Sequence, residues 1–165
     1  MPDKIDQNLA FAFAEESRTA ARDAVFSLKA EEEGFRQLAR LFRAMANAGL
    51  VHRQRFLLLM RGKISATEEN LKEAFQNKNR VVEECYPGMI EDASEASKAV
   101  KKAFLQSRKT DAEHAEFYRK AMENMYSKDY MEYYVCQICG HIHEDFAPEN
   151  CPVCQAVVSR FKKID

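Results

Sequence analysis

Four cysteines near the end of the chain have the residue type and spacing that bind a single metal ion. Cys136 and Cys139 form one Cys-x-x-Cys pair, and Cys151 and Cys154 form a second. Four thiolates complete a tetrahedral shell for iron or zinc, and the backbone N–H groups of each turn can point at its sulfurs. The spacing therefore predicts a four-cysteine metal site. Sulfur ligands alone do not choose between zinc, which would be structural, and iron, which changes between two redox states.

The alternative use of these cysteines is in two disulfides, which need an oxidising compartment. The chain begins Met-Pro-Asp-Lys with no apolar signal segment, so we expect a cytoplasmic location and a metal site. The fifth cysteine, Cys85, has no cysteine left to pair with. We expect it to be a small buried hydrophobic residue.

Composition excludes several classes of partner. The chain of 165 residues has 25 Lys and Arg against 26 Asp and Glu, which leaves a net charge of −1. No global basic field is present to attract nucleic acid or an anionic membrane, and no apolar run approaches the roughly 18 residues that span a bilayer. We therefore expect neither nucleic acid nor membrane as a partner.

The elements that must position any site begin with a helical pattern from Asn8 to about Met125. Its apolar spacing predicts a mainly α protein built as a four-helix bundle. The first expected helix covers residues 7–33, and the second ends at 60–61 before Gly62. A short helix then begins at a capping box of Ser65 and Glu68 and runs through Phe75. A third long helix is kinked at Pro87, and the last covers residues 97–125. A polar linker at 127–129 and a strand at 133–135 lead into the cysteines. We therefore divide the chain into a bundle, 1–128, and a small β and knuckle metal module, 129–165.

Ligand-type side chains fall on the core-facing stripes of these helices. They are Glu16, His52, Glu84, Asp111 and His114. A buried carboxylate left unpaired costs several kcal/mol, and metal coordination would satisfy these groups together. Asp111 and His114 are three residues apart and project from one helix face, as a pair that binds one ion must. The alternative is that each lies at a bundle end or in a hydrogen-bonded network.

The order of these parts resembles that of rubrerythrins over essentially the whole chain. Asn8-Leu9 through Glu15-Glu16 is similar to the family's first-helix motif, and residues 67–72 and 84–87 are similar to its middle. Residues 134–144, Ala147-Pro148-Glu149 and Cys151-Pro152 are very similar to its C-terminal module. The resemblance implies a ferritin-like four-helix bundle followed by a rubredoxin-like module.

Rubrerythrins hold two irons in the bundle and one in the rubredoxin-like site. They typically reduce hydrogen peroxide to water with electrons that reach the rubredoxin-like iron from a reductase. The resemblance therefore implies iron, with zinc as the alternative, in the four-cysteine site, and a rubredoxin-type reductase or other electron donor as a partner. It also implies a homodimer.

The chain departs from the family at three ligand positions. Gly49 and Val81 stand where the family has carboxylates, and Asp111 stands where Glu is usual. A further departure is Gln155, which stands where the second knuckle often has Gly and is expected to need a positive φ. The resemblance therefore implies a weakened or lost di-iron site.

Five matching positions leave alternatives for the bundle. Glu84, Asp111 and His114 correspond to ligands of one iron and can hold a single ion with water. Glu16 and His52 correspond to the other iron, or they can pair with each other in an empty polar pocket.

Three functions follow from these expectations. The first is a rubrerythrin-like oxidoreductase that passes electrons from the four-cysteine iron to an interior iron and reduces peroxide in oxidative-stress defence. The second is an electron carrier without oxygen chemistry, in which the bundle is a docking scaffold. The third is a helical scaffold held together by zinc, without turnover.

Overall fold

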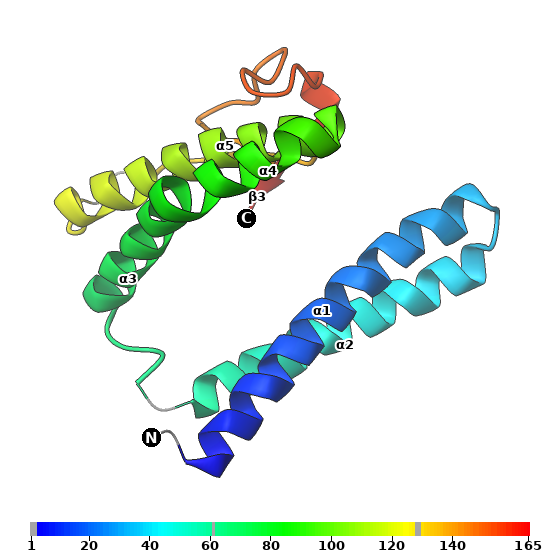
Figure 1. The fold of residues 1–165 in the computed structure, drawn as a ribbon, viewed down its shortest axis with the longest axis horizontal. Coiled ribbons are helices and arrows are strands. Elements are labelled where there is room, and N and C mark those ends of the chain that lie inside the picture. The colour runs from blue at the N-terminus through cyan, green and yellow to red at the C-terminus, as the bar shows by residue number, and fades with distance from the viewer. Residues whose placement is uncertain (1–2, 61, 128–129) are drawn as a thin grey trace. The chain divides into compact units, whose positions relative to one another are not determined.

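The computed structural model describes residues 3–60, 62–127 and 130–165, and these are mainly helical (Figure 1). The chain divides into two compact units, Met1–Ser65 and Ala66–Asp165, and each is described by itself. Among the described residues, no helix is long and apolar enough to cross a membrane.

The first unit is a hairpin of α1 (Lys4–Glu32) and α2 (Arg36–Leu59). Asp3 caps α1, since its carboxylate accepts hydrogen bonds from the backbone N–H groups of Ile5 and Asp6. The turn between the helices passes through Gly34, whose φ of 82° lies in the left-handed region that glycine adopts without strain. The N–H groups of Gly34 and Phe35 bond back into the last turn of α1 and end the helix there.

Small residues line the contact between α1 and α2. The buried ones are Ala20, Ser27, Ala30, Ala39, Ala46 and Gly49. At Gly49 a Cβ atom would lie 3.0 Å from the Cβ of Ala20, so the two backbones approach closely. Leu38 and Met45, which helical periodicity places on a core-facing stripe, remain about half exposed. Small residues rather than large ones therefore form the core of this hairpin.

The second unit begins with α3 (Thr67–Arg80), a π-helical segment (Val81–Cys85) and α4 (Tyr86–Ala96). The predicted capping box is wrong, because the N-cap residue of α3 is Ala66, whose side chain cannot accept a hydrogen bond. Glu68 instead pairs with Lys72 at 2.6 Å. The predicted short helix ending at Phe75 is also wrong, since α3 continues without a break to Arg80.

Pro87 lies at the start of α4, inside a stretch that is helical without a break from Thr67 to Ala96, so the proline does not end the helix, as predicted. Proline cannot donate a backbone hydrogen bond and crowds the carbonyl four residues earlier. The preceding turn widens in response, and the N–H of Tyr86 bonds to the carbonyl of Val81 in the π pattern. Cys85, at the end of this turn, is half-buried and not fully buried as expected.

The last helix, α5 (Lys98–Glu123), packs against both α3 and α4. Ser97 caps it by accepting from the N–H of Val100, and its bounds agree with the prediction. Beyond it lies an antiparallel sheet in the order β2-β1-β3. The strands are β1 (Tyr133–Cys136), β2 (Ile142–Glu144) and β3 (Phe161–Ile164), with a short 3-10 helix, η2 (Val158–Arg160), before β3.

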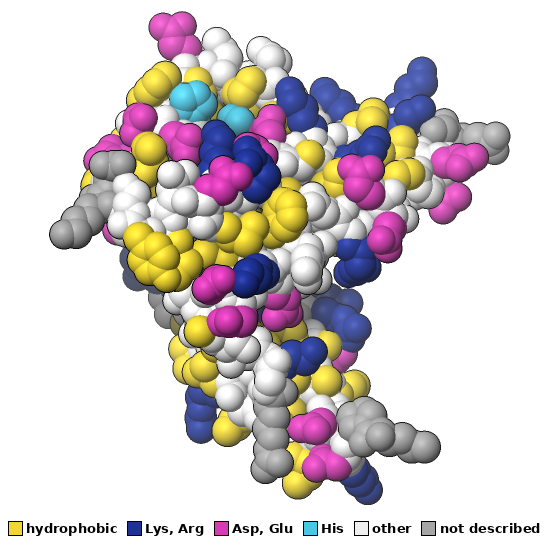
Figure 2. Space-filling model, turned by 90° about the vertical axis from the view of Figure 1, so that its left-hand side faces the viewer, with side chains coloured by type: hydrophobic (Ala, Val, Ile, Leu, Met, Phe, Trp, Pro, Cys, Tyr) yellow, Lys and Arg dark blue, Asp and Glu magenta, His cyan; other side chains and the backbone are white. Residues whose placement is uncertain are grey.

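The predicted fold class is confirmed: the chain is mainly α with a small C-terminal sheet and two cysteine knuckles. The predicted domain boundary at 128–129 lies outside the described residues and stays a prediction. On one face of the molecule, hydrophobic side chains lie among charges of both signs (Figure 2). This mixture agrees with the near-neutral net charge of −1.

Candidate metal site

The four cysteine sulfurs lie together as the spacing predicted. The Sγ atoms of Cys136, Cys139, Cys151 and Cys154 are all within 4.8 Å of one another. The Cys136–Cys154 and Cys139–Cys151 sulfur pairs are 3.7 Å and 3.6 Å apart. An ion bonded to four sulfurs at about 2.3 Å in a tetrahedron separates them by roughly 3.8 Å. The sulfur positions therefore fit one tetrahedral metal ion.

Two equivalent turns position the sulfurs. In the first knuckle the N–H of Gly140 bonds to the carbonyl of Cys136, and in the second the N–H of Gln155 bonds to the carbonyl of Cys151, both at 2.9 Å. Gly140 has a φ of 77° and Gln155 has a φ of 64°. The expectation of a positive φ at Gln155 is confirmed, and a residue with a Cβ there costs about 1–2 kcal/mol.

Two of the four thiols, Cys139 and Cys154, resist ionisation without a cation. Burial raises the pKa values of Cys139 and Cys154. Burial opposes ionisation at Cys136 too, but hydrogen bonds from the backbone N–H groups of Cys139 and Ile138 outweigh it and lower the pKa of Cys136. A bound metal cation lowers the pKa of each thiol, because it binds the sulfur in the deprotonated thiolate form. The cluster is thus arranged for a metal rather than for four free thiols.

Two of the predicted interior residues lie together in the first unit. Nδ1 of His52 is 3.3 Å from a carboxylate oxygen of Glu16. They line a pocket of about 320 Å³ together with Arg55, Phe56 and Leu59. This is the pairing given above as one alternative for the bundle.

Asp111 in the second unit is bound by protein groups. One of its carboxylate oxygens forms an ion pair with the ammonium of Lys78, and the other accepts a hydrogen bond of 3.1 Å from the hydroxyl of Tyr86. Burial and the neighbouring Asp111 charge raise the pKa of Tyr86. Sequence reasoning missed Lys78, because it lies 33 residues from Asp111 and no local pattern indicates their pairing.

His114 and Glu84 do not join in one cluster. Nε2 of His114 is 3.0 Å from the carbonyl oxygen of Gly140 in the first knuckle, and its Nδ1 is 3.4 Å from Asp111. Glu84 is exposed in the π-helical segment. The extra residue in that turn rotates Glu84 away from the register that a regular α-helix predicts. Within residues 66–127 and 130–165, the four cysteines are the one group of three or more ligand-type residues whose atoms meet.

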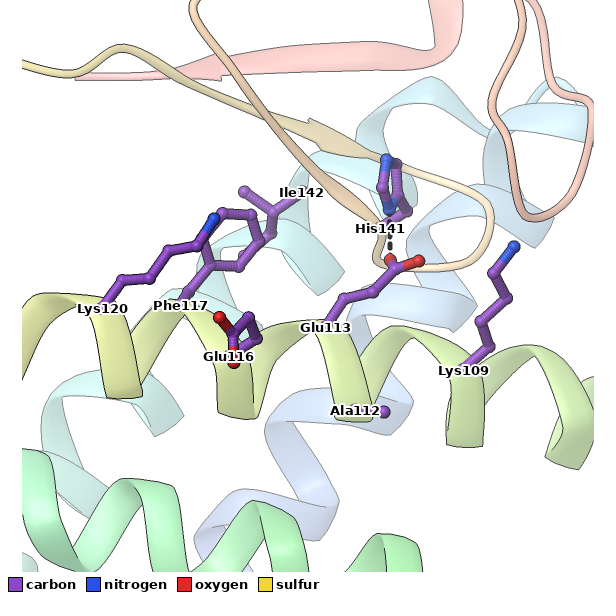
Figure 3. Close-up of a pocket in the computed structure, with 8 residues that line it drawn as sticks. All are labelled: Lys109, Ala112, Glu113, Glu116, Phe117, Lys120, His141 and Ile142. Carbon is purple, nitrogen blue, oxygen red and sulfur yellow. Dashed lines mark hydrogen bonds and ion pairs between the residues drawn. The ribbon is translucent and has the colours of Figure 1, made fainter.

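A second contact joins α5 to the first knuckle. Nδ1 of the buried His141 is 2.6 Å from a carboxylate oxygen of Glu113 (Figure 3). Beside it lies an open pocket of about 450 Å³, lined by Lys109 and Phe117 of α5 and by Ile142 of β2 among others. Sequence reasoning missed Glu113 and His141. The signal was the position of His141 directly after the knuckle glycine.

Comparison with known proteins identifies the family. A family model described as rubrerythrin matches residues 7–122, and one described as the rubrerythrin rubredoxin-like domain matches residues 134–162. The chain belongs to the rubrerythrin family. The nigerythrin of Nitratidesulfovibrio vulgaris is 32% identical to it, over 90% of this chain and 80% of its own. The rubrerythrin of Porphyromonas gingivalis is 29% identical, over 92% of this chain and 85% of its own.

Solved structures agree with the family. A structure of nigerythrin in a mixed-valence state aligns with 99% of this chain and 88% of its own, with a TM-score of 0.56 and 26% identity. The ferritin-like and rubredoxin-like architecture predicted above is thereby confirmed for this chain.

The residues of this chain fit one of the family's two kinds of metal site better than the other. The cysteine positions fit one iron or zinc ion. The bundle positions do not fit a two-iron centre, because Gly49 and Val81 have no carboxylate and Asp111 is paired with Lys78. A weakened or single-ion bundle site that uses Glu16, His52, Glu84, Asp111 and His114 stays a prediction.

Proposed function

We propose that this member of the rubrerythrin family is an iron-binding electron-transfer oxidoreductase whose working centre is the four-cysteine site. The observation that carries the proposal is the set of four sulfurs within 4.8 Å of one another. Iron bound there supplies one-electron redox chemistry. Structures of the related nigerythrin include a fully reduced one described as all ferrous, which supports iron over zinc.

The protein around the sulfurs serves electron transfer in two ways. Cys136 and Cys151 are buried, which keeps water from one side of the centre. Cys139 and Cys154 are half-buried, and the neighbouring side chains of Ile138 and Val157 are exposed and apolar. A rubredoxin-type reductase, or another donor with an apolar contact patch, can approach the half-buried sulfurs there.

Metal content and Cys139→Ser test the proposal together. We expect iron and visible iron–thiolate absorption in anaerobically purified protein, with loss of that absorption and loosening of residues 133–165 in the variant. The helical circular dichroism should persist, because three-sulfur coordination weakens the module and not the helices. The same protein should accept electrons from a rubredoxin-type reductase. A colourless protein with zinc at four sulfurs would support a structural scaffold instead.

Peroxide reduction is the second candidate function. It is favoured by Glu16 and His52, which place a carboxylate and an imidazole 3.3 Å apart at the edge of a pocket. The test is peroxide consumption by the reduced protein, with Glu16→Gln as the variant and Glu15→Gln, on the same helix, as the control. If the wild type and both variants consume peroxide equally, at the rate of free iron in solution, peroxide reduction is ruled out and electron transfer is the function that stands.

A gain-of-function variant tests whether the bundle site is degraded. Gly49→Glu with Val81→Glu restores both missing carboxylates and should raise iron bound beyond the ion at the cysteines. Because a Cβ at Gly49 meets Ala20 at 3.0 Å, Ala20→Gly belongs in the same variant to leave room for the new side chain. Unchanged iron content in a folded triple variant would show that the bundle is not a degraded metal site.

A further inference from the structure

One peptide group links helix α5 to the four-cysteine centre. The carbonyl oxygen of Gly140 accepts a hydrogen bond from Nε2 of His114 at 3.0 Å. The N–H on the other side of that peptide, which belongs to His141, donates to the sulfur of Cys139. A continuous path of hydrogen bonds therefore runs from the imidazole of α5, through one peptide, to a metal ligand.

We infer that His114 is a positioning residue for the four-cysteine centre, which raises its reduction potential through the peptide between Gly140 and His141. The inference rests on the proposed function, since it concerns iron at the four sulfurs. A donor on a carbonyl oxygen polarises the peptide and makes its N–H a stronger donor. Stronger N–H···S bonds favour the reduced state, in which the thiolate shell carries more negative charge.

The surroundings hold the imidazole in the orientation that this role needs. The carbonyl of Gly140 can only accept, so Nε2 of His114 carries the proton. Its Nδ1 lies 3.4 Å from a carboxylate oxygen of Asp111, and this contact is an ion pair when Nδ1 carries a proton too. Asp111 is held by Lys78 and by Tyr86. The side chains of His114 and Asp111 are 17% and 15% exposed, so water competes little for these bonds. Helices α3 and α4 thereby fix a side chain of α5 against the knuckle.

A neighbouring contact provides the matched control. Glu113 bonds to the imidazole of His141 at 2.6 Å and not to the peptide that faces Cys139. It also attaches α5 to the knuckle. Loss of Glu113 weakens this attachment but leaves the carbonyl bond of Gly140 in place. The two variants therefore separate electronic tuning from simple docking.

The experiment is a redox titration of the iron-loaded full chain, followed by its visible absorption. In His114→Leu the ratio of reduced to oxidised centre at fixed potential should fall roughly three- to tenfold, the effect of weakening one hydrogen bond. A tenfold fall corresponds to a potential about 59 mV lower for one electron. His114→Gln, whose amide can still donate, should recover most of the change, and Glu113→Gln should shift the ratio less than about twofold. A ratio in His114→Leu that matches the wild type, or an equal fall in Glu113→Gln, would overturn the inference.

A second measurement does not depend on iron. In the zinc-loaded protein, the amide proton of His141 should move upfield in His114→Leu, because its bond to the sulfur weakens, and should stay in place in Glu113→Gln. An unmoved resonance in His114→Leu would overturn the inference even if iron proved not to be the native metal. Failure to bind or reduce iron, with the expected amide shift still present, would instead overturn the proposed function.

Discussion

At the scale of single residues, the charge on Asp111 must be matched. The resemblance assigns that task to iron, whereas the structure gives it to the ammonium of Lys78 and the hydroxyl of Tyr86. A lysine supplies one positive charge without any metal. The Lys78 ammonium contacts Oδ1 of Asp111, which is also the oxygen nearest to Nδ1 of His114. A metal ion bound by Asp111 and His114 would therefore have to displace the lysine. Together with Val81 in place of a carboxylate, this pairing explains why ligand-type residues of α5 persist without forming a metal cluster among the described residues of this unit.

Lys78→Met should destabilise the protein. The change leaves the carboxylate of Asp111, only 15% exposed, without its ammonium partner, which costs about 1–2 kcal/mol once partial solvent access is allowed for. Denaturant unfolding of the zinc-loaded protein measures this. Lys72→Met, which breaks the exposed pair with Glu68 on the same helix, is the control and should cost less than about 0.5 kcal/mol. Equal losses in the two variants would contradict a structural role for the Lys78 pair.

Tyr86 should give the stability a dependence on alkaline pH. Burial, with the Asp111 charge second, raises the pKa of its hydroxyl above the ordinary value near 10. Its contribution to stability is therefore fully present below the unfolded pKa and is lost as the pH rises through the raised folded pKa. The ultraviolet absorbance of phenolate can be measured against pH for the wild type and for Tyr86→Phe, and the difference between the two curves reports Tyr86. This difference should appear at a higher pH than the ionisation of exposed tyrosines. A difference curve with its midpoint at the ordinary tyrosine value would rule this out.

At the scale of the elements, several local patterns were predictable, although the capping box at Ser65 was not correct, and distant contacts were not predictable. Both knuckles, the strand at Tyr133 and the start of α5 at Ser97 rest on a few neighbouring residues, so sequence alone located them. The helix continues past Pro87 as predicted, but the π-helical segment before the proline was not predicted, since a π turn and a kink are two ways to avoid the same clash. The Lys78–Asp111 pair and the His114–Gly140 bond join residues far apart in the chain. No local pattern indicates them.

The close contact of α1 and α2 predicts a coupling between Gly49 and Ala20. Gly49→Ala gains about 1 kcal/mol of helix propensity, but its Cβ meets that of Ala20 at 3.0 Å, and overpacking costs about 1–3 kcal/mol. The net effect in the native background should therefore be neutral to destabilising. In an Ala20→Gly background the same change should stabilise by roughly 0.5–1 kcal/mol. Free energies of unfolding for the wild type, the two single variants and the double variant give the coupling energy between the two positions. Additive effects would show that the two helices do not constrain each other at this contact.

At the scale of the whole molecule, the α1–α2 hairpin has several large apolar side chains on the surface of its own unit. Leu38, Leu41 and Met45 of α2 are each about half exposed, and so is Phe26 of α1. Large apolar side chains exposed on a protein surface are commonly part of an interface. We propose a homodimer that covers this face, in agreement with the expectation drawn from the family resemblance.

Leu41→Lys tests the dimer directly. The chain has a mass of 19.0 kDa, so light scattering should give twice that value, about 38 kDa, for the wild type at micromolar concentration. A buried ammonium without a partner is costly enough to separate the copies, so the variant should give the single-chain mass with its helical content kept. Gln54→Lys adds the same charge at an exposed polar position of α2 and should remain a dimer. A wild type with the single-chain mass would contradict the dimer, whereas a Leu41→Lys dimer would place its interface away from this hairpin face.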